Sequence, residues 1–409
     1  MVEESFVRTE SARCLQCYDA PCMNACPAGI TIPRFIRMLA SGNYQGAAEV
    51  VRTCNPFISI CSAVCPTEEL CHKNCSRAKI DSGIRIKELH DFAFRYDNGK
   101  PINFESNKKV AIVGAGPCGL ACAFELRKMG ILATVFEEDA EGGIPATQIP
   151  SHRLEQKRLV EDLEFLKKFG IRVQKKKIKP EDLESLKKEY GAVFLAVGAQ
   201  HSKQLGIPGE DAKGCYPASE FLKLAKDKEI THKTLGDDVL VIGGGNVAID
   251  SACVAKEIGC ENVTIVYRRT RKEMPAWKSE IEEAINRGVE FLFLRAPVKV
   301  VVNKGKVSGL QVQKMELKGK DDSGRPKPIA IKGSEYEIPA SAVISAIGQE
   351  APNFPVKMEN GKIVVKDFKT SIDGVFAGGD AINGGMTISQ AVGDGRAAAH
   401  AIFKYLGGA

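Results

Sequence analysis

The sequence lacks any long hydrophobic run. The apolar segment at residues 291–294 is soon interrupted by Arg295 and Lys299, and no stretch reaches the about 20 apolar residues that a membrane-spanning helix needs. The first ten residues, MVEESFVRTE, contain no basic region followed by an apolar one, so we expect no signal peptide. These absences predict a cytoplasmic protein that does not associate with a membrane.

The chain also lacks a strong charge of one sign. Its 409 residues carry a formal net charge of +6 and a pI near 8.5. The densest basic run, Lys175–Lys177, is typical of a solvated face. This mild balance does not favour nucleic acid as a partner. The length is enough for two or three domains with cores of their own.

Some common catalytic signatures are missing as well. There is no G-x-S-x-G nucleophile elbow and no H-E-x-x-H zinc motif. After residue 105 there is no C-x-x-C pair, since Cys118 and Cys122 are separated by three residues. These two cysteines are typical of small buried helix residues. Their spacing argues against a disulfide reductase of the thioredoxin-reductase kind.

What is present is a dense group of cysteines near the N-terminus. Nine of the 14 lie in the segment 14–75, mostly in two runs: Cys14-x2-Cys17-x4-Cys22-x3-Cys26-Pro27 and Cys61-x3-Cys65-Pro66-x4-Cys71-x3-Cys75. A proline after a cluster cysteine is typical of ferredoxin-like runs, in which the fourth cysteine often binds the other cluster. On a large chain without a secretion signal, this density favours iron–sulfur clusters.

Structural zinc is the main alternative at these cysteines, and disulfides are a second one. Zinc sites usually pair two C-x2-C knuckles, whereas only Cys14 and Cys17 have that spacing here. Eight thiolates would be sufficient for two [4Fe–4S] clusters. The spacing alone does not assign individual cysteines to them.

The first glycine-rich turn follows a predicted buried strand at residues 109–113 and opens a helix. Its residues are Gly114, Ala115, Gly116, Pro117, Cys118 and Gly119. In such a turn the first glycine permits the sharp bend, the second lets a pyrophosphate approach, and the third lets the helix pack on the strand. Glu137, at the end of the next strand, is placed to accept hydrogen bonds from a ribose. We expect FAD here.

The second glycine-rich turn follows a strand at residues 239–242 and consists of Gly243, Gly244, Gly245, Asn246, Val247 and Ala248. The next strand ends in Tyr267, Arg268 and Arg269 instead of an acid. Since a ribose 2′-hydroxyl prefers a carboxylate and a 2′-phosphate prefers guanidinium groups, we predict NADP(H) rather than NAD(H). The alternative is that these arginines only face solvent.

A late strand ends in Gly378-Gly379-Asp380, and a helix is predicted from about Thr387. An aspartate at this place can hydrogen-bond a flavin ribityl chain or phosphate. The helix N-terminus can stabilise negative charge on a reduced flavin. With Gly114 and Glu137, this pattern indicates a flavin site.

Strands that alternate with helices predict a doubly wound α/β fold. We expect an N-terminal α-helical [4Fe–4S] domain at residues 1–105, followed by two Rossmann-like dinucleotide-binding domains. The FAD domain would have two segments, 106–205 and 343–409, split by an NAD(P)H-binding domain at 206–342.

A cysteine module followed by two dinucleotide folds resembles the glutamate synthase small subunit and its relatives. These include the N-terminal half of dihydropyrimidine dehydrogenase and its bacterial NAD(P)H-oxidising subunit. The segments 65–71 and 142–154 are most similar to the dihydropyrimidine dehydrogenase branch. The segment 324–337 and the triplet Tyr267-Arg268-Arg269 look more like glutamate synthase small subunits.

The resemblance implies two [4Fe–4S] clusters and their ligands. One cluster would be held by Cys14, Cys17, Cys22 and Cys75, and the other by Cys26, Cys65, Cys71 and a residue from a later helix. The position that aligns with a glutamine ligand of the dehydrogenase is His90; the alternative is that His90 only packs on its helix. The resemblance also implies that Gly143 and Arg153 belong to the flavin site.

We therefore predict an electron-input oxidoreductase subunit that oxidises NAD(P)H with FAD and passes electrons through two clusters. No catalytic side chain is expected, because the hydride moves between cofactors. The favoured partner is an FMN-containing dihydropyrimidine dehydrogenase subunit that reduces uracil or thymine. The alternatives are the glutamate synthase large subunit and a partner that bifurcates electrons to ferredoxin. A redox sensor or assembly scaffold is disfavoured by the intact cofactor motifs.

Overall fold

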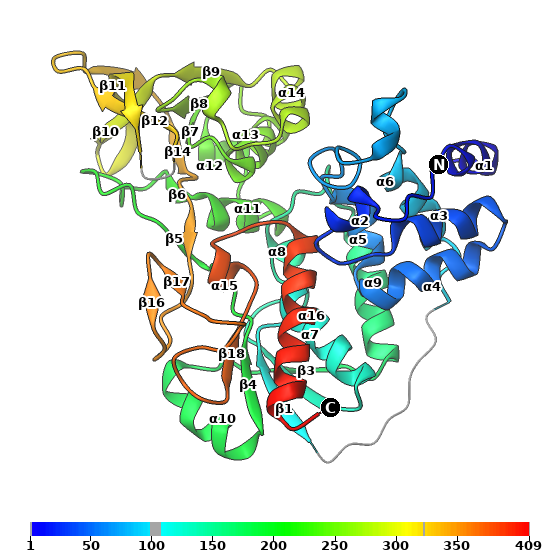
Figure 1. Cartoon of the computed structure of the whole chain (residues 1–409). Helices are drawn as coiled ribbons and strands as arrows, with labels where there is room; N and C mark the ends of the chain where they lie inside the picture. Colours follow the sequence, from blue (N-terminus) through cyan, green and yellow to red (C-terminus); the bar gives the residue numbers. More distant parts are fainter. Residues whose placement is uncertain (1, 99–107, 322–323, 409) are drawn as a thin grey trace. The chain divides into compact units, whose positions relative to one another are not determined.

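A computed structural model describes residues 2–98, 108–321 and 324–408. It divides into two compact units, each of which is described by itself below (Figure 1). The first unit consists of residues 1–146, 151–200 and 350–409, and the second of residues 147–150 and 201–349. The second unit is therefore an insertion in the sequence of the first.

The N-terminal part of the first unit is α-helical. Helix α3 begins after Thr31 and has Pro33 in its first turn, as the sequence predicts, although the Thr31 side chain makes no capping hydrogen bond. The apolar face of α3 is buried, and most of the cysteines lie between the helices, whereas Cys22, Cys54 and Cys61 lie within them. The helices are α1 (Glu4–Ala12), α2 (Pro21–Asn24), α3 (Ile32–Ala40), α4 (Tyr44–Cys54), α5 (Ile58–Val64), η1 (Ser76–Lys79) and α6 (Ile86–Phe94).

The first unit also contains a five-stranded parallel sheet in the order β18-β4-β1-β2-β3. Its strands are β1 (Lys109–Val113), β2 (Leu132–Glu137), β3 (Arg172–Lys175), β4 (Ala192–Leu195) and β18 (Val375–Ala377). The connecting helices are α7 (Pro117–Lys128), α8 (Ile144–Thr147), α9 (Gln156–Lys168) and α10 (Leu183–Glu189). Strand β4 and residues 110–113 of β1 are fully buried, as expected for the centre of a parallel sheet that is covered on both faces.

The last helix, α16 (Ile388–Tyr405), packs along α7 (Figure 1). The two helices come very close at Gly395, where a Cβ atom would lie 2.2 Å from the carbonyl oxygen of Cys118. A short helix, α15 (Asp380–Asn383), joins β18 to α16. Residues that follow the inserted unit therefore complete both the sheet and the helix layer of the first unit.

The second unit has its own five-stranded parallel sheet in the order β6-β14-β7-β8-β9. Its strands are β6 (Cys215–Pro217), β7 (Asp238–Ile242), β8 (Asn262–Tyr267), β9 (Glu290–Phe293) and β14 (Ala342–Ser345). Its helices are α11 (Ala218–Lys226), α12 (His232–Leu235), α13 (Asn246–Ile258) and α14 (Lys278–Asn286). Both sheets thus have the topology of a dinucleotide fold.

An antiparallel sheet follows β9 in the second unit, and the sequence analysis did not predict it. It consists of β10 (Arg295–Asn303), β11 (Lys306–Lys320), β12 (Pro326–Ala330) and β13 (Tyr336–Pro339). The long strand β11 pairs with all three others. Its inner residues Leu310 and Val312 belong to a hydrophobic cluster with Leu240 and Ile242 of β7.

The predicted α/β fold class with two Rossmann-like sheets is confirmed, whereas the assignment of FAD and NAD(P)H domains stays a prediction. The compact units divide the chain at other residues: β14 pairs with β6 and β7, so residues 343–349 belong to the second unit, and the first unit resumes at 350. The inserted unit begins at 201 instead of 206, and the expected boundary at 105 lies outside the described residues. Among the described helices, none is long and apolar enough to span a membrane.

Candidate cofactor-binding sites

The first glycine-rich turn joins β1 to α7. Gly114 has a φ of +105°, a backbone conformation that favours glycine. A Cβ atom on Gly119 would lie 2.0 Å from the carbonyl oxygen of Gly114, so only glycine lets α7 approach the turn this closely. The turn is therefore built for a close helix–strand contact, as its sequence predicts.

The N-terminus of α7 presents its backbone N–H groups at this turn. Gly116 is the N-cap residue and Pro117 follows it, and no side chain makes a capping hydrogen bond. Gly143 lies against Gly116, since a Cβ atom on Gly143 would be 3.0 Å from the Gly116 Cα. An uncapped helix N-terminus lined by glycine backbone fits a pyrophosphate group. Arg153 lies half-buried in the turn before α9.

Glu137 lies at the end of β2, beside the same turn. Its side chain is buried and accepts hydrogen bonds from the backbone N–H groups of Ala115 (2.7 Å) and Asp139 (2.8 Å). These bonds hold the carboxylate at the carboxyl edge of the sheet, where ligands of open α/β sheets bind. Its position fits the role of a ribose acceptor.

Asp380 and Thr387 lie on either side of the turn that leads into α16. The Asp380 carboxylate accepts a hydrogen bond from the backbone N–H of Met386 (3.1 Å), and burial raises the pKa of Asp380. Thr387 is the N-cap of α16, and its hydroxyl accepts a hydrogen bond from the Gln390 N–H (3.1 Å). Gly379 precedes Asp380 with a φ of +66°. This region is polar and lies at a helix N-terminus, as the flavin prediction requires.

The second glycine-rich turn joins β7 to α13 in the inserted unit. Gly245 is the N-cap of α13, again without a side-chain capping bond, and Val247 in the first turn is exposed. Asn246 accepts a hydrogen bond from the Trp277 N–H (2.9 Å), which ties the turn to the loop before α14. Ala248 is fully buried. The predicted residues 243–248 thus form a second uncapped helix N-terminus.

Tyr267 occupies the place at the end of β8 where the first sheet has its glutamate. A Cβ atom on Gly244 would lie 2.4 Å from the Tyr267 ring, so the ring packs directly against the turn. The Tyr267 hydroxyl donates to the carbonyl oxygen of Glu273 (2.8 Å). No carboxylate therefore occupies the position of Glu137 in this sheet.

Arg268 and Arg269 have opposite environments, although the sequence predicts one role for both. Arg268 is exposed. Arg269 is only 2% exposed: its Nε donates to the carbonyl oxygen of Pro326 (2.8 Å) and its other end pairs with Asp321. The expectation that Arg269 holds a 2′-phosphate does not fit this position, because its guanidinium group is already bound within the unit.

The cysteines of the N-terminal part form two groups. In the first, burial and then the thiols of Cys75 and Cys14 raise the pKa of Cys22 to about 12. Burial also raises the pKa of Cys14, with contributions from Cys75 and Cys17. The structure therefore brings together the four cysteines that the resemblance assigns to one cluster.

The second group contains Cys26, Cys65 and Cys71. Burial raises the pKa of Cys65 to about 11, and Cys26 contributes to this shift. Burial also raises the pKa of Cys71, with contributions from Cys65 and Cys26. Cys61 is buried beside this group, and Cys54 lies near Cys26. Raised thiol pKa values mean that metal binding must displace the protons.

His90 lies on α6, and its imidazole is buried with the Nε2 atom unpaired among the described residues. Burial, with a smaller contribution from Arg52, lowers the pKa of His90 to about 4. The ring is therefore neutral, which is the form that binds metals. An orphaned buried nitrogen fits the proposed role of fourth ligand.

These groups do not have the geometry of a single-ion site. Across the described part of the chain, no three His, Cys, Asp or Glu side chains converge as they would around one metal ion. Zinc draws its ligands to about 2.0–2.3 Å. A four-iron cluster instead spreads four ligands over four iron atoms.

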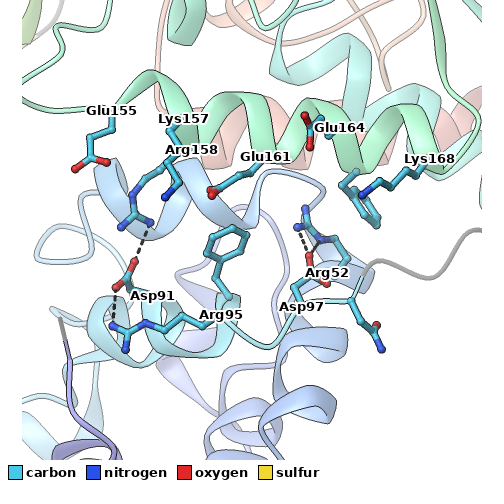
Figure 2. A pocket seen from close by; sticks show the side chains of 13 residues that line it. Arg52, Asp91, Arg95, Asp97, Glu155, Lys157, Arg158, Glu161, Glu164 and Lys168 are labelled. Carbon is cyan, nitrogen blue, oxygen red and sulfur yellow. Dashed lines mark hydrogen bonds and ion pairs between the residues drawn. The ribbon is translucent and has the colours of Figure 1, made fainter.

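A charged seam joins the cysteine helices to α9 within the first unit (Figure 2). Arg52 on α4 pairs with Asp97 and with Asp162 of α9 (3.1 Å). Asp162 is fully buried and accepts hydrogen bonds from the backbone N–H groups of Ser59 (3.1 Å) and Ile60 (3.0 Å). Burial raises the pKa of Asp162 to about 6, against the lowering by Arg52.

A cavity of about 540 Å³ lies along the same seam. Figure 2 shows Asp91 between two arginines, Arg158 (2.8 Å) and Arg95 (3.5 Å). The arginines of the cavity thus pair with its two aspartates. The sequence analysis missed this seam; the only signal was one carboxylate, Asp162, on the otherwise apolar face of α9.

The family model for pyridine nucleotide-disulphide oxidoreductases matches residues 108–395. The chain belongs to this family. A second model, the 4Fe-4S cluster domain II of dihydropyrimidine dehydrogenase, matches residues 1–101. The chain therefore combines a pyridine nucleotide-disulphide oxidoreductase domain with a 4Fe-4S cluster domain, and the predicted family resemblance is confirmed.

Several curated relatives match almost the whole chain. The NADPH-Fe(3+) oxidoreductase subunit beta of Geobacter sulfurreducens is 36% identical over 95% of this chain, but the chain spans only 64% of that relative. The small chain of glutamate synthase [NADPH] of Escherichia coli is 33% identical, with 98% of this chain and 92% of the relative covered. The NAD-dependent dihydropyrimidine dehydrogenase subunit PreT of Escherichia coli O157:H7 is 35% identical, with 98% and 94% covered.

Solved structures support the fold. Mycobacterium tuberculosis FprA in complex with NADPH has a TM-score of 0.64 and 22% sequence identity. The match covers 74% of this chain and 85% of that one. At this identity the likeness concerns the fold alone.

Proposed function

We propose that this chain is an electron-input subunit that oxidises NADPH with FAD and delivers electrons through two [4Fe–4S] clusters to a partner protein. The observation that supports this most is the contact between Cys65 and Ser389 of α16 (3.8 Å). Helix α16 carries the proposed flavin residues at its N-terminus, so the second cysteine group lies beside the flavin site within one compact unit.

Each cofactor has a set of residues in this proposal. The turn at residues 114–119 binds the FAD pyrophosphate at the N-terminus of α7, and Glu137 binds its ribose. Asp380 and the α16 N-terminus bind the flavin end. When bound, FAD takes a hydride from the nicotinamide and the clusters carry single electrons. The protein chain binds and orients the cofactors and sets the electrostatic field around them.

We assign the nicotinamide nucleotide to the turn at residues 243–248 and the 2′-phosphate to Arg268. Tyr267 leaves no carboxylate to select a free 2′-hydroxyl, and Arg268 is exposed at the end of β8. Arg269 instead holds Asp321 and the backbone of Pro326. The relatives' names include both NADPH and NAD, so this preference rests on the residues.

The first cysteine group is proposed as the electron exit toward the partner. Leu15 and Tyr18 are exposed large hydrophobic residues that directly follow Cys14 and Cys17, and Ile80, also exposed, lies a few residues after Cys75. Arg13 and Asp81, which flank this group, form an ion pair (3.0 Å) that holds the two loops together. Exposed apolar residues beside a redox site are typical of a surface that another protein covers.

The partner that we favour is an FMN-containing dihydropyrimidine dehydrogenase subunit. The N-terminal domain match and the PreT relative support it. The glutamate synthase large subunit is the second candidate, supported by the small-chain relative. A partner that bifurcates electrons to ferredoxin is a third. The cytoplasmic location stays a prediction from the sequence.

The proposal is tested by anaerobic optical and EPR titration of the purified chain with NADPH and, separately, NADH, together with iron and sulfide analysis. We expect about eight iron atoms per chain and faster flavin bleaching with NADPH. Zinc in place of iron, or a flavin that neither nucleotide reduces, would contradict the proposal.

The partner is tested separately. Affinity capture from the native host, followed by assays with uracil and with glutamine plus 2-oxoglutarate, distinguishes the two main candidates. Uracil reduction that depends on the captured protein supports the first, and glutamate formation supports the second.

A further inference from the structure

Ser389 links the helix of the flavin site to a proposed cluster ligand. It lies in the first turn of α16 and is only 4% exposed. Its Oγ atom is 3.8 Å from the Sγ atom of Cys65, which is the C-cap residue of α5. The Cys65 thiol can donate to Ser389, but a cysteine that ligates iron has lost its proton and can only accept.

The backbones around this contact also come close together. Further along α16, a Cβ atom on Gly393 would lie 2.2 Å from the carbonyl oxygen of Pro27, the residue after Cys26. Helix α16 therefore lies directly on the backbone next to Cys26, a member of the second cysteine group.

The neighbouring hydroxyl permits Ser389 to act as a donor. Thr387 accepts a hydrogen bond from the backbone N–H of Gln390 (3.1 Å), and its Oγ1 atom lies 3.0 Å from the Ser389 Oγ, where either hydroxyl can donate. When Thr387 donates to Ser389, the Ser389 proton is available for the Cys65 sulfur.

We propose that Ser389 is a positioning residue that raises the reduction potential of the flavin-side cluster by donating a hydrogen bond to Cys65. Reduction adds negative charge to a cluster, and a donor at a ligating sulfur stabilises that charge. The effect is local because only one cysteine receives this bond. This inference rests on the proposed function, since it requires that Cys65 ligates iron.

The test is an anaerobic EPR redox titration of the full chain with both clusters in place. Ser389→Ala removes the hydroxyl, and we expect the midpoint potential of one cluster to move to a more negative value while the other stays unchanged. Ser251→Ala is the matched control. Ser251 is also a fully buried helix serine, but its hydroxyl donates to the Val247 carbonyl oxygen of its own helix (2.8 Å).

A second pair of variants keeps the test decisive if S389A loses iron. Ser389→Thr keeps the hydroxyl and Ser389→Val removes it, while both add nearly the same volume. We expect S389T to keep a potential near that of the unchanged chain and S389V to show the negative shift. Equal potentials in S389T and S389V would overturn the inference.

The failure of the inference is distinct from that of the proposed function. If the unchanged chain contains no four-iron cluster, the proposed function fails and the inference fails with it. If the unchanged chain contains both clusters and S389A leaves both potentials in place, or moves both equally, only the role of Ser389 is overturned.

Discussion

The two parallel sheets of this protein use the same phosphate turn but differ in its third residue. In the first unit, Gly119 allows α7 to touch the carbonyl oxygen of Gly114. In the second, Ala248 takes that place, and its Cβ lies 3.2 Å from where a Cβ of Gly243 would be. The second turn is therefore slightly wider. Both turns thus share the uncapped backbone N-terminus of the following helix, whereas the third residue of the turn is free to differ.

The sheets differ more strongly at the end of their second strand. The first has the buried carboxylate of Glu137, and the second has the Tyr267 ring followed by exposed Arg268. Both turns present an uncapped helix N-terminus, so in our proposal the identity of the bound dinucleotide depends on this strand end.

The sheets also differ in what is attached to them. Helix α9 of the first is held to the cysteine helices by the Arg52–Asp162 seam. The second instead carries the antiparallel sheet β10–β13. The first sheet is therefore tied to the cysteine helices, whereas the second is extended by a sheet of its own.

The largest expected effect comes from breaking the seam. Asp162→Ala leaves Arg52 without one of its partners and removes the acceptor for two N–H groups of α5. We expect the free energy of unfolding of the first unit to fall by about 3–5 kcal/mol, measured by chemical denaturation. Glu164→Ala, an exposed carboxylate on the same helix, is the control and should change it little. Equal effects of the two variants would contradict the role of the seam.

The next effect concerns the strand end. Arg268→Ala removes a charge-assisted bond worth about 1.5–3 kcal/mol, so the Kd for NADPH should rise roughly 10- to 150-fold, while that for NADH changes little. Isothermal titration measures both. Arg172→Ala, an exposed arginine of β3, is the charge-matched control. An equal rise in the Kd for both nucleotides would contradict the assignment of Arg268 to the 2′-phosphate.

The third effect tests the turns by exchanging their third residues. Gly119→Ala places a Cβ 2.0 Å from a carbonyl oxygen, which should cost about 1–3 kcal/mol and weaken FAD retention. Ala248→Gly should cost only about 1 kcal/mol through helix propensity and leave FAD bound. Flavin content after gel filtration and thermal unfolding give the two readouts. If Gly119→Ala keeps its flavin, the close contact is not required for FAD.

The smallest effect is the pH dependence of Asp162. Its pKa is about 6 in the fold, against an ordinary value of 3.8. Between these values the folded chain binds more protons than the unfolded chain, so acidification from pH 6 to 4 favours the fold. We expect the stability of the unchanged chain relative to Asp162→Asn to rise in this window by on the order of 1 kcal/mol. A difference in Tm that is constant with pH would contradict this.

The sequence predicted the parts of the fold that depend on local pattern. The strands ending at Val113, Ile242 and Ala377 and the helix start at Thr387 are confirmed, because apolar runs that meet glycines mark these edges. The antiparallel sheet was missed, although parts of β11 alternate polar and apolar residues in the way that is typical of a half-buried strand.

The contacts between distant segments could not be read from the sequence. The Arg268 side chain is exposed and the Arg269 side chain is buried. This difference depends on Asp321, which follows β11 and pairs with Arg269. The bond between Cys65 and Ser389 joins residues from the two ends of the first unit. Such pairings arise when elements that are distant in the sequence pack together, and no local sequence pattern at either residue indicates them.

The nesting of the second unit within the first has a consequence for synthesis. Strand β18 must insert beside β4, and α16 beside α7, only after residues 201–349 have been made. The second unit is contiguous in sequence except for residues 147–150, so it is able to fold on the ribosome. At that stage the edge of β4 that later pairs with β18 is still open. During that interval the first unit is incomplete, because its sheet and its helix layer close only when β18 and α16 reach their distant partners, which is a slow step. The proposed flavin site forms only after that closure.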